Sequence, residues 1–234
     1  MIAAVILAAG NGSRMAGSLP KQFLKIEGKP VLVRTVEAFL RSDLVDRVVV
    51  AVAKDWLDYA ERLLEEAFGG AAPISVTVGG SSRLQSLINA CAFLSDAFGI
   101  TKDDIVLTHD AARPFVTKQV IAENIKLLDS YDGVTTACPA VDTILVSADG
   151  KKVDDIPLRK TMFSVQTPQT FHTGELIETI ASLTEAEKSA LTDAAKAYVL
   201  KKKRVGIVLS ETTNLKLTTA ADLSLAASLM LGEK

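Results

Sequence analysis

The chain has 234 residues, and 26 lysine and arginine residues against 28 aspartate and glutamate residues give it a formal net charge of −2. This length fits one α/β domain of residues 1–234, and so small a charge provides no general attraction for nucleic acid or a membrane surface. Its two cysteines, Cys91 and Cys138, lie far apart in apolar stretches, and no apolar stretch is long enough to span a bilayer. We therefore expect a cytoplasmic protein with free thiols.

Over the first two thirds of the chain, apolar stretches rich in β-branched residues alternate with helical patterns. Apolar strands separated by helices predict an α/β fold with a mostly parallel sheet flanked by helices, in which ligands lie beyond the carboxyl ends of the strands. Three polar segments follow strands directly, at residues 10–21, 79–86 and 109–113. The predicted strands are residues 2–7, 47–53, 75–78, 104–108 and 133–137, and the predicted helices are 30–41, 56–68, 83–97 and 118–131.

The pattern changes after residue 137. Extended segments at 141–147 and 152–165 flank Asp149-Gly150, a strong hairpin-turn signal. They predict a β-hairpin arm at about 140–165 that protrudes from the sheet, with an ordinary antiparallel sheet edge as the alternative. The predicted remainder consists of helices at 175–183, 185–199 and 221–231 and a strand at 204–209.

The first glycine-rich loop lies within AVILAAGNGSRMAGSLPKQF, residues 4–23. It is not a P-loop, because Ser18 follows Gly17 where the lysine belongs, and Met15 stands where a dinucleotide fingerprint needs its third glycine. The loop still offers uncrowded backbone N–H groups together with Arg14 and Lys21, two cations suited to phosphate. A solvated surface loop is the alternative, but both cations following a buried strand favour phosphoryl chemistry.

Five motifs in this order resemble the cytidylyltransferases for 2-C-methyl-D-erythritol 4-phosphate and D-ribitol 5-phosphate: LAAGNGSRMAGSLPKQF, GGSSRLQS, HDAARPF, VQTPQTF and NLKLTT. The resemblance covers nearly the whole chain. It implies a Rossmann-like nucleotidyltransferase fold and a reaction of CTP with an alditol phosphate that gives a CDP-alditol and pyrophosphate. A phosphate monoester, with a second pKa of about 6, is already mostly ionised at neutral pH, so this chemistry needs no general base.

The resemblance also implies residue roles and partners. It implies Mg²⁺ held mainly by the CTP phosphates, with Asp110 as the nearest carboxylate, and a homodimer formed through the arm, in which Arg159 acts in its own or the neighbouring site. A turn or helix cap is the alternative for both Asp110 and GGSS. The implied catalytic residues are Arg14 and Lys21; the nucleotide-binding residues are Leu7, Ala8, Ala9, Gly10, Gly79, Gly80, Ser81, Arg83 and Ser86; the substrate-binding residues are Asp110, Arg113, Thr143, Arg159, Thr192 and Lys216.

Three smaller sequence features bear on the prediction of the alditol. IPLR at 156–159, the insertion LTEAEKSALTDAA at 183–195 and the lack of a basic pair after Ile144 resemble the ribitol branch. LAAG and HDAARPF are common in the methylerythritol branch, which is the alternative. Two other classes stay open, a purine-using sugar-phosphate nucleotidyltransferase and a non-catalytic nucleotide-binding module.

Overall fold

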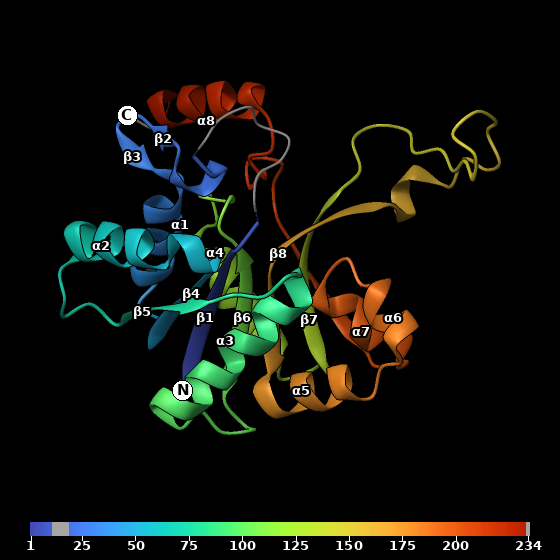
Figure 1. The fold of residues 1–234 in the computed structure, drawn as a ribbon. Helices are drawn as coiled ribbons and strands as arrows, with labels where there is room; N and C mark the ends of the chain where they lie inside the picture. Colours follow the sequence, from blue (N-terminus) through green and yellow to red (C-terminus); the bar gives the residue numbers. More distant parts are fainter. Residues whose placement is uncertain (11–18, 233–234) are drawn as a thin grey trace.

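The computed structural model describes residues 1–10 and 19–232. Its described part contains a seven-stranded sheet in the order β5-β4-β1-β6-β8-β7-β9 (Figure 1). Only β8 runs antiparallel to its neighbours, so the expected mostly parallel sheet is confirmed. The strands are β1 (Ile2–Ala8), β4 (Arg47–Val52), β5 (Ile74–Val78), β6 (Ile105–Asp110), β7 (Gly133–Pro139), β8 (Phe163–His172) and β9 (Val205–Leu209), and β2 (Lys25–Ile26) pairs with β3 (Lys29–Pro30) in a separate hairpin.

Helices cover both faces of the sheet, as strands that are apolar throughout require. Neighbouring residues of a strand point to opposite faces, so Ile6 packs under the first group of helices and Val5 under the second. The first group is α1 (Val31–Leu40), α2 (Leu57–Phe68) and α4 (Lys118–Leu127); the second is α3 (Arg83–Phe98), α5 (Thr173–Ala181) and α7 (Ala194–Leu200). Helix α6 (Glu185–Ser189) precedes α7, and α8 (Ala220–Gly232) packs over β2.

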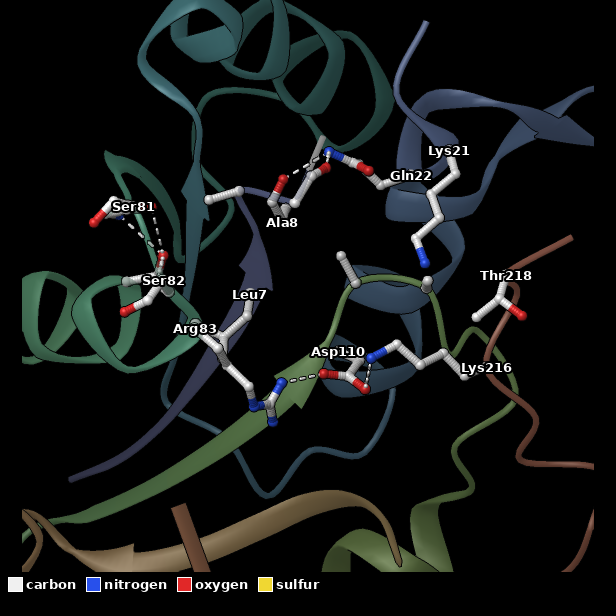
Figure 2. A pocket seen from close by; sticks show the side chains of 16 residues that line it. Leu7, Ala8, Lys21, Gln22, Ser81, Ser82, Arg83, Asp110, Lys216 and Thr218 are labelled. Carbon is white, nitrogen blue, oxygen red and sulfur yellow. Dashed lines mark hydrogen bonds and ion pairs between the residues drawn. The ribbon is translucent and has the colours of Figure 1, made fainter. Parts of the chain in front are cut away.

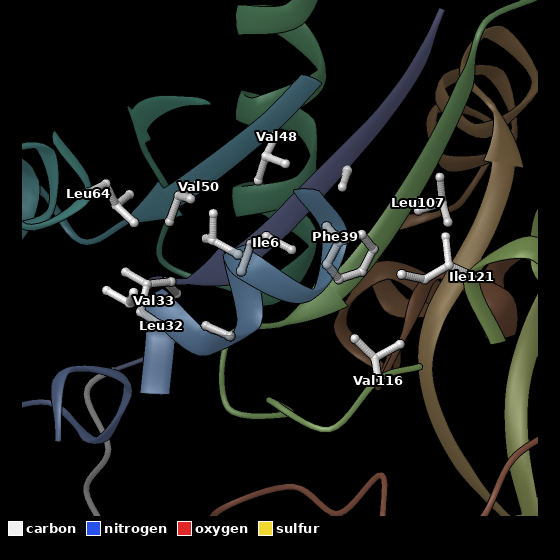
Figure 3. Packing of buried hydrophobic residues seen from close by; sticks show 14 of the residues in the cluster. Ile6, Leu32, Val33, Phe39, Val48, Val50, Leu64, Leu107, Val116 and Ile121 are labelled. Carbon is white, nitrogen blue, oxygen red and sulfur yellow. The ribbon is translucent and has the colours of Figure 1, made fainter. Parts of the chain in front are cut away.

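The core beneath α1 fixes the strand ends that carry the site. Phe39 and Leu32 of α1 are fully buried against Ile6 of β1 and Val50 of β4 (Figure 3). Truncating a buried phenylalanine such as Phe39 to alanine costs about 3–5 kcal/mol, because a cavity adds to the lost apolar burial. The carboxyl end of β1 is therefore firmly held.

Two sequence predictions differ from the structure. Residues 166–172 were not expected in the sheet, yet they form most of β8, where the polar side chain of Gln169 is buried and donates to Thr135 Oγ1 at 2.9 Å. The predicted helix at 185–199 is broken at residues 190–193, because Asp193 caps a new helix by accepting from Lys196 N at 3.0 Å.

The arm leaves the sheet between β7 and β8 and projects away from the body of the molecule (Figure 1). Only its last residues, from Phe163 on, join the sheet, since the β7–β8 ladder runs out to Pro139 and Phe163. Beyond that point the arm holds one isolated antiparallel bridge, Val146 to Asp155, and the short 3-10 helix η3 (Arg159–Thr161). The extended segments predicted there are thus mostly irregular.

Candidate active site

A pocket of about 360 Å³ lies at the carboxyl ends of β1 and β6 (Figure 2). Polar segments that the sequence placed after strands meet here, as expected for a parallel sheet. A further wall comes from residues 216–218, after β9. The described lining residues are Leu7, Ala8, Ala9, Gly10, Lys21, Gln22, Gly80, Ser81, Ser82, Arg83, Ser86, Asp110, Ala111, Ala112, Lys216 and Thr218.

The loop before α3 is packed too tightly for side chains at its two glycines. A Cβ on Gly80 would lie 2.3 Å from Gln85 Cγ, and one on Gly79 would lie 2.8 Å from Ala9 Cβ. Ser82 caps α3 by accepting from Gln85 N at 3.0 Å. The Ser86 hydroxyl accepts from Gly80 N at 2.9 Å and donates to Ser82 O at 2.8 Å, so this side chain orders the loop.

Gln22 lines the pocket and was not among the predicted site residues. Its side chain is buried, and Nε2 donates to Ala8 O at 2.6 Å and to Gly10 O at 3.4 Å. These bonds fasten η1 (Lys21–Phe23) to the end of β1. Lys21, the neighbouring residue, points into the pocket as a result (Figure 2).

Asp110 is the carboxylate with which the cationic side chains in and beside the pocket pair. Its Oδ1 pairs with Arg83, and its Oδ2 lies 2.9 Å from Lys216 Nζ and 3.4 Å from Arg113 Nε. Burial alone raises the pKa of Asp110, but the three cations outweigh burial and hold this pKa well below its usual range. The described wall of the pocket itself carries three cationic side chains, Lys21, Arg83 and Lys216, and one carboxylate, Asp110. Their net positive charge attracts a polyanion.

His109 is fully buried beneath the pocket and is not exposed to it. Its Nε2 lies 3.0 Å from Arg113 O, which can only accept, so Nε2 carries the proton. Its Nδ1 then accepts from Thr167 Oγ1 at 3.0 Å, and that oxygen accepts from Asp110 N at 3.1 Å. Burial lowers the pKa of His109 to about 4, which keeps the ring neutral and makes it a structural support for Asp110.

The structure brings most of the predicted site residues together, but not all. Thr143 and Arg159 lie exposed on the arm, outside the pocket, and Arg159 Nη1 donates to Val141 O at 3.2 Å. Thr192 lines a separate cavity of about 20 Å³ that Arg83 also borders. Arg14 lies outside the described residues. Five lining residues were not among the predicted site residues, although each lies inside one of the quoted motifs: Gln22, Ser82, Ala111, Ala112 and Thr218.

Within residues 1–10 and 19–232, no group of three or more His, Cys, Asp or Glu side chains is arranged to hold a metal ion. Asp110 is the one carboxylate among the described residues of the pocket wall. This donor set fits a cation that keeps most of its ligands from phosphates and water, as Mg²⁺ does. No helix in the described part of the chain is long and apolar enough to cross a membrane.

Comparison with known proteins agrees with this architecture. The sequence profile of the 2-C-methyl-D-erythritol 4-phosphate cytidylyltransferase family matches residues 2–232. A ribitol-5-phosphate cytidylyltransferase of Streptococcus pneumoniae (strain Hungary19A-6) is 40% identical over 232 residues, which cover 98% of this chain and 99% of that protein.

Solved structures give the same result. The 4-diphosphocytidyl-2C-methyl-D-erythritol synthase of Anaerococcus prevotii DSM 20548 superposes with a TM-score of 0.81 at 25% identity, covering 98% of this chain and 96% of that one. The 2-C-methyl-D-erythritol 4-phosphate cytidylyltransferase of Francisella tularensis superposes with a TM-score of 0.79 at 28% identity, covering 96% and 97%. A nucleotidyltransferase fold, a cationic pocket at its strand ends and a profile match along nearly the whole length together show that this chain belongs to the 2-C-methyl-D-erythritol 4-phosphate cytidylyltransferase family of enzymes.

Proposed function

We propose that this enzyme joins CTP and D-ribitol 5-phosphate to give CDP-ribitol and pyrophosphate. The observation that carries the choice of alditol is the 40% identity, over nearly both full lengths, to a relative named for ribitol 5-phosphate. The solved structures, named for the methylerythritol substrate, are only 25% and 28% identical. 2-C-methyl-D-erythritol 4-phosphate is the second candidate, favoured by the family profile.

The pocket has the chemistry that this reaction needs. An oxygen of the alditol phosphate attacks the α-phosphorus of CTP, the bond from that phosphorus to the β-phosphate oxygen breaks, and pyrophosphate leaves with the electron pair. No proton has to move, so the difficulty is the repulsion between two anions. Lys21 faces the pocket, where a fixed cation stabilises the five-coordinate phosphorus more than the bound substrates. We assign Arg14 the same task, and Lys216 the binding of the incoming phosphate.

Cytosine recognition falls to the loop before α3. Gly80 and Ser81 line the pocket, and backbone N–H and C=O groups of this loop can match the donor and acceptor pattern of a base edge. Mg²⁺, when bound, would neutralise charge on the triphosphate oxygens. Asp110 is the residue that would hold it, with Arg83 and Lys216 keeping the carboxylate ionised.

The test is a coupled pyrophosphate assay with CTP and each alditol phosphate. We expect kcat/KM to favour ribitol 5-phosphate by at least about tenfold, because each pocket group left without its substrate hydroxyl costs about 1–3 kcal/mol. EDTA should stop the reaction and added Mg²⁺ should restore it. Equal or faster turnover of the methylerythritol substrate would favour the second candidate function. Release of pyrophosphate only with ATP or GTP would contradict the use of CTP.

We also propose a homodimer that forms through the arm. Its apolar side chains are exposed in the single chain: Val141 at 69%, Ile156 at 58% and Leu158 at 67%. The exposed patch continues onto the sheet, because Val165 of β8 and Leu209 of β9 both pair with Ala137 and so share one face. Exposed apolar side chains that continue from the arm onto the sheet support a protein partner. A second copy of this chain, bound through the arm, would bring Arg159 of one chain toward the pocket of the other.

Cytoplasmic location is part of the same proposal. Cys91 and Cys138 are free and buried, and burial raises the pKa of Cys91 to about 12. Such thiols are inert packing groups, as in proteins of reducing compartments.

A further inference from the structure

The segment that carries Lys216 lacks regular structure. Residues 210–219 connect β9 to α8 without helix or strand. The backbone bond from Leu217 N to Ala112 O, at 2.9 Å, joins this segment to the pocket wall. A lysine side chain on such a segment needs a further support if its ammonium is to stay in place.

Asn214, two residues before Lys216, provides this support. Its side chain is buried, and Nδ2 donates to Gln166 Oε1 at 2.9 Å and to Thr167 O at 3.0 Å, both in β8. Gln166 Nε2 donates to Glu211 O at 3.2 Å, so its Oε1 must face Asn214. Asn214 Oδ1 is buried and has no hydrogen-bond partner among the described residues. The site therefore uses the two N–H donors of Asn214, which no carboxylate can replace.

Asn214 also closes a ring of contacts around Asp110. Its backbone carbonyl accepts from Arg113 Nη1 at 2.7 Å, and the Nε of the same guanidinium lies 3.4 Å from Asp110 Oδ2. Lys216 Nζ completes the ring at 2.9 Å from that Oδ2. The distance between Lys216 and Asp110 is thus set by Asn214 through two independent paths, the chain itself and Arg113.

We infer that Asn214 is a positioning residue that aims Lys216 at the incoming alditol phosphate. Asn214 does not line the pocket, so it acts through Lys216 and not on the substrate. The inference rests on the proposed role of Lys216 as the group that binds this phosphate. Displacing a charge by about 1 Å costs up to roughly 100-fold in an enzyme, so loss of the Asn214 amide should be visible in the kinetics.

The test compares Asn214→Asp with Asn124→Asp. Asn124 is an equally buried amide, whose Nδ2 donates to Val120 O and Thr136 Oγ1, both at 2.9 Å, and it lies outside the pocket wall. Asn214→Asp turns donors into acceptors that face Gln166 Oε1 and Thr167 O. We expect it to raise the KM for the alditol phosphate at least about tenfold and the KM for CTP less than about twofold. Asn124→Asp should lower stability and leave both KM values near wild type.

A double-mutant cycle with Lys216→Ala separates positioning from simple damage. Because Asn214 acts through Lys216, Asn214→Asp should add less than about twofold to the alditol KM once the lysine is gone. If Asn214→Asp does not fold, Gln166→Met, which removes one acceptor of the Asn214 amide, provides the same measurement with a smaller rise. Additive effects, equal rises in both KM values, or an Asn124→Asp variant that behaves the same would overturn the inference. A Lys216→Ala variant with a normal alditol KM would instead contradict the proposed role of Lys216.

Discussion

At the scale of single residues, Lys21 is presented to the pocket by its neighbour. Gln22 bonds to Ala8 O and Gly10 O and so fixes η1 at the end of β1. A cation held in this way is already oriented before the substrate arrives. Pre-organisation of charge is the largest single source of catalysis in sites of this kind.

Lys21→Ala should lower kcat by at least about tenfold while the Kd of CTP changes less, since the charge acts mainly on the transition state. The matched control is Lys25→Ala, which removes an exposed lysine four residues later, outside the described pocket wall. Steady-state kinetics and calorimetric binding of CTP provide the measurement. A normal kcat with a raised KM for CTP would make Lys21 a binding residue only.

His109 gives the enzyme a pH dependence of stability. Burial lowers the pKa of its ring from 6.5 to about 4. Between pH 6.5 and about pH 4, His109 is therefore protonated in the unfolded chain but neutral in the folded protein. The contribution of His109 is therefore complete above pH 6.5 and is lost as the pH falls toward 4. Between about pH 7.5 and about pH 5, His109→Gln should lose about 2 kcal/mol less stability than wild type. Urea unfolding at both pH values measures this, and an identical loss in both proteins would exclude His109 as the source.

Much of the site was predictable from sequence because polar segments after buried strands meet at one edge of a parallel sheet. Lys21, Gly80 and Asp110 come from such segments and lie there; Lys216, which was predicted from the family resemblance alone, joins them. The roles of Gln22 and Asn214 were not predicted, although both residues lie inside quoted motifs. Their roles depend on hydrogen bonds to residues 12 to 48 positions away, which no local pattern reveals.

At the scale of elements, the strands that are apolar along their whole length were predicted to within a few residues, because burial on both faces leaves little room for polar side chains. Strand β8 was missed since Gln169 and Thr170 satisfy their polar atoms inside the fold, with Thr135 Oγ1 and Asn124 Oδ1. The arm was predicted from its turn signal, but its lack of regular pairing was not. Its conformation depends on contacts beyond the local sequence.

The arm should determine the oligomeric state. Ile156→Glu puts a charge into the exposed apolar patch and should convert the dimer to a monomer at micromolar concentration, because an unpaired buried charge is costly. Leu225→Glu in α8 is the control, since Leu225 is 52% exposed against 58% for Ile156 but lies away from the arm. Sedimentation velocity measures both. A wild-type monomer with full activity would contradict the dimer.

At the scale of the whole molecule, the question is whether one chain holds a complete site. Arg159 lies outside the pocket of its own chain, bonded to Val141 O. A mixed dimer of one Lys21→Ala chain and one Arg159→Ala chain decides this. If Arg159 acts in the neighbouring site, one of the two sites is intact and the mixed dimer should keep about half of the wild-type rate. An inactive mixed dimer, purified by two different tags, would place Arg159 in its own chain's site.

The arm is an excursion between β7 and β8, which are direct neighbours in the sheet. The two ends of the arm are therefore joined by one antiparallel ladder, in which Ala137 pairs with Val165 and Pro139 with Phe163. Lengthening or shortening the segment between Pro139 and Phe163 leaves every pairing in the ladder unchanged. The tip can then change in length and sequence while the strands that frame the pocket, which opens on the same edge of the sheet at the carboxyl ends of β1 and β6, keep their pairing.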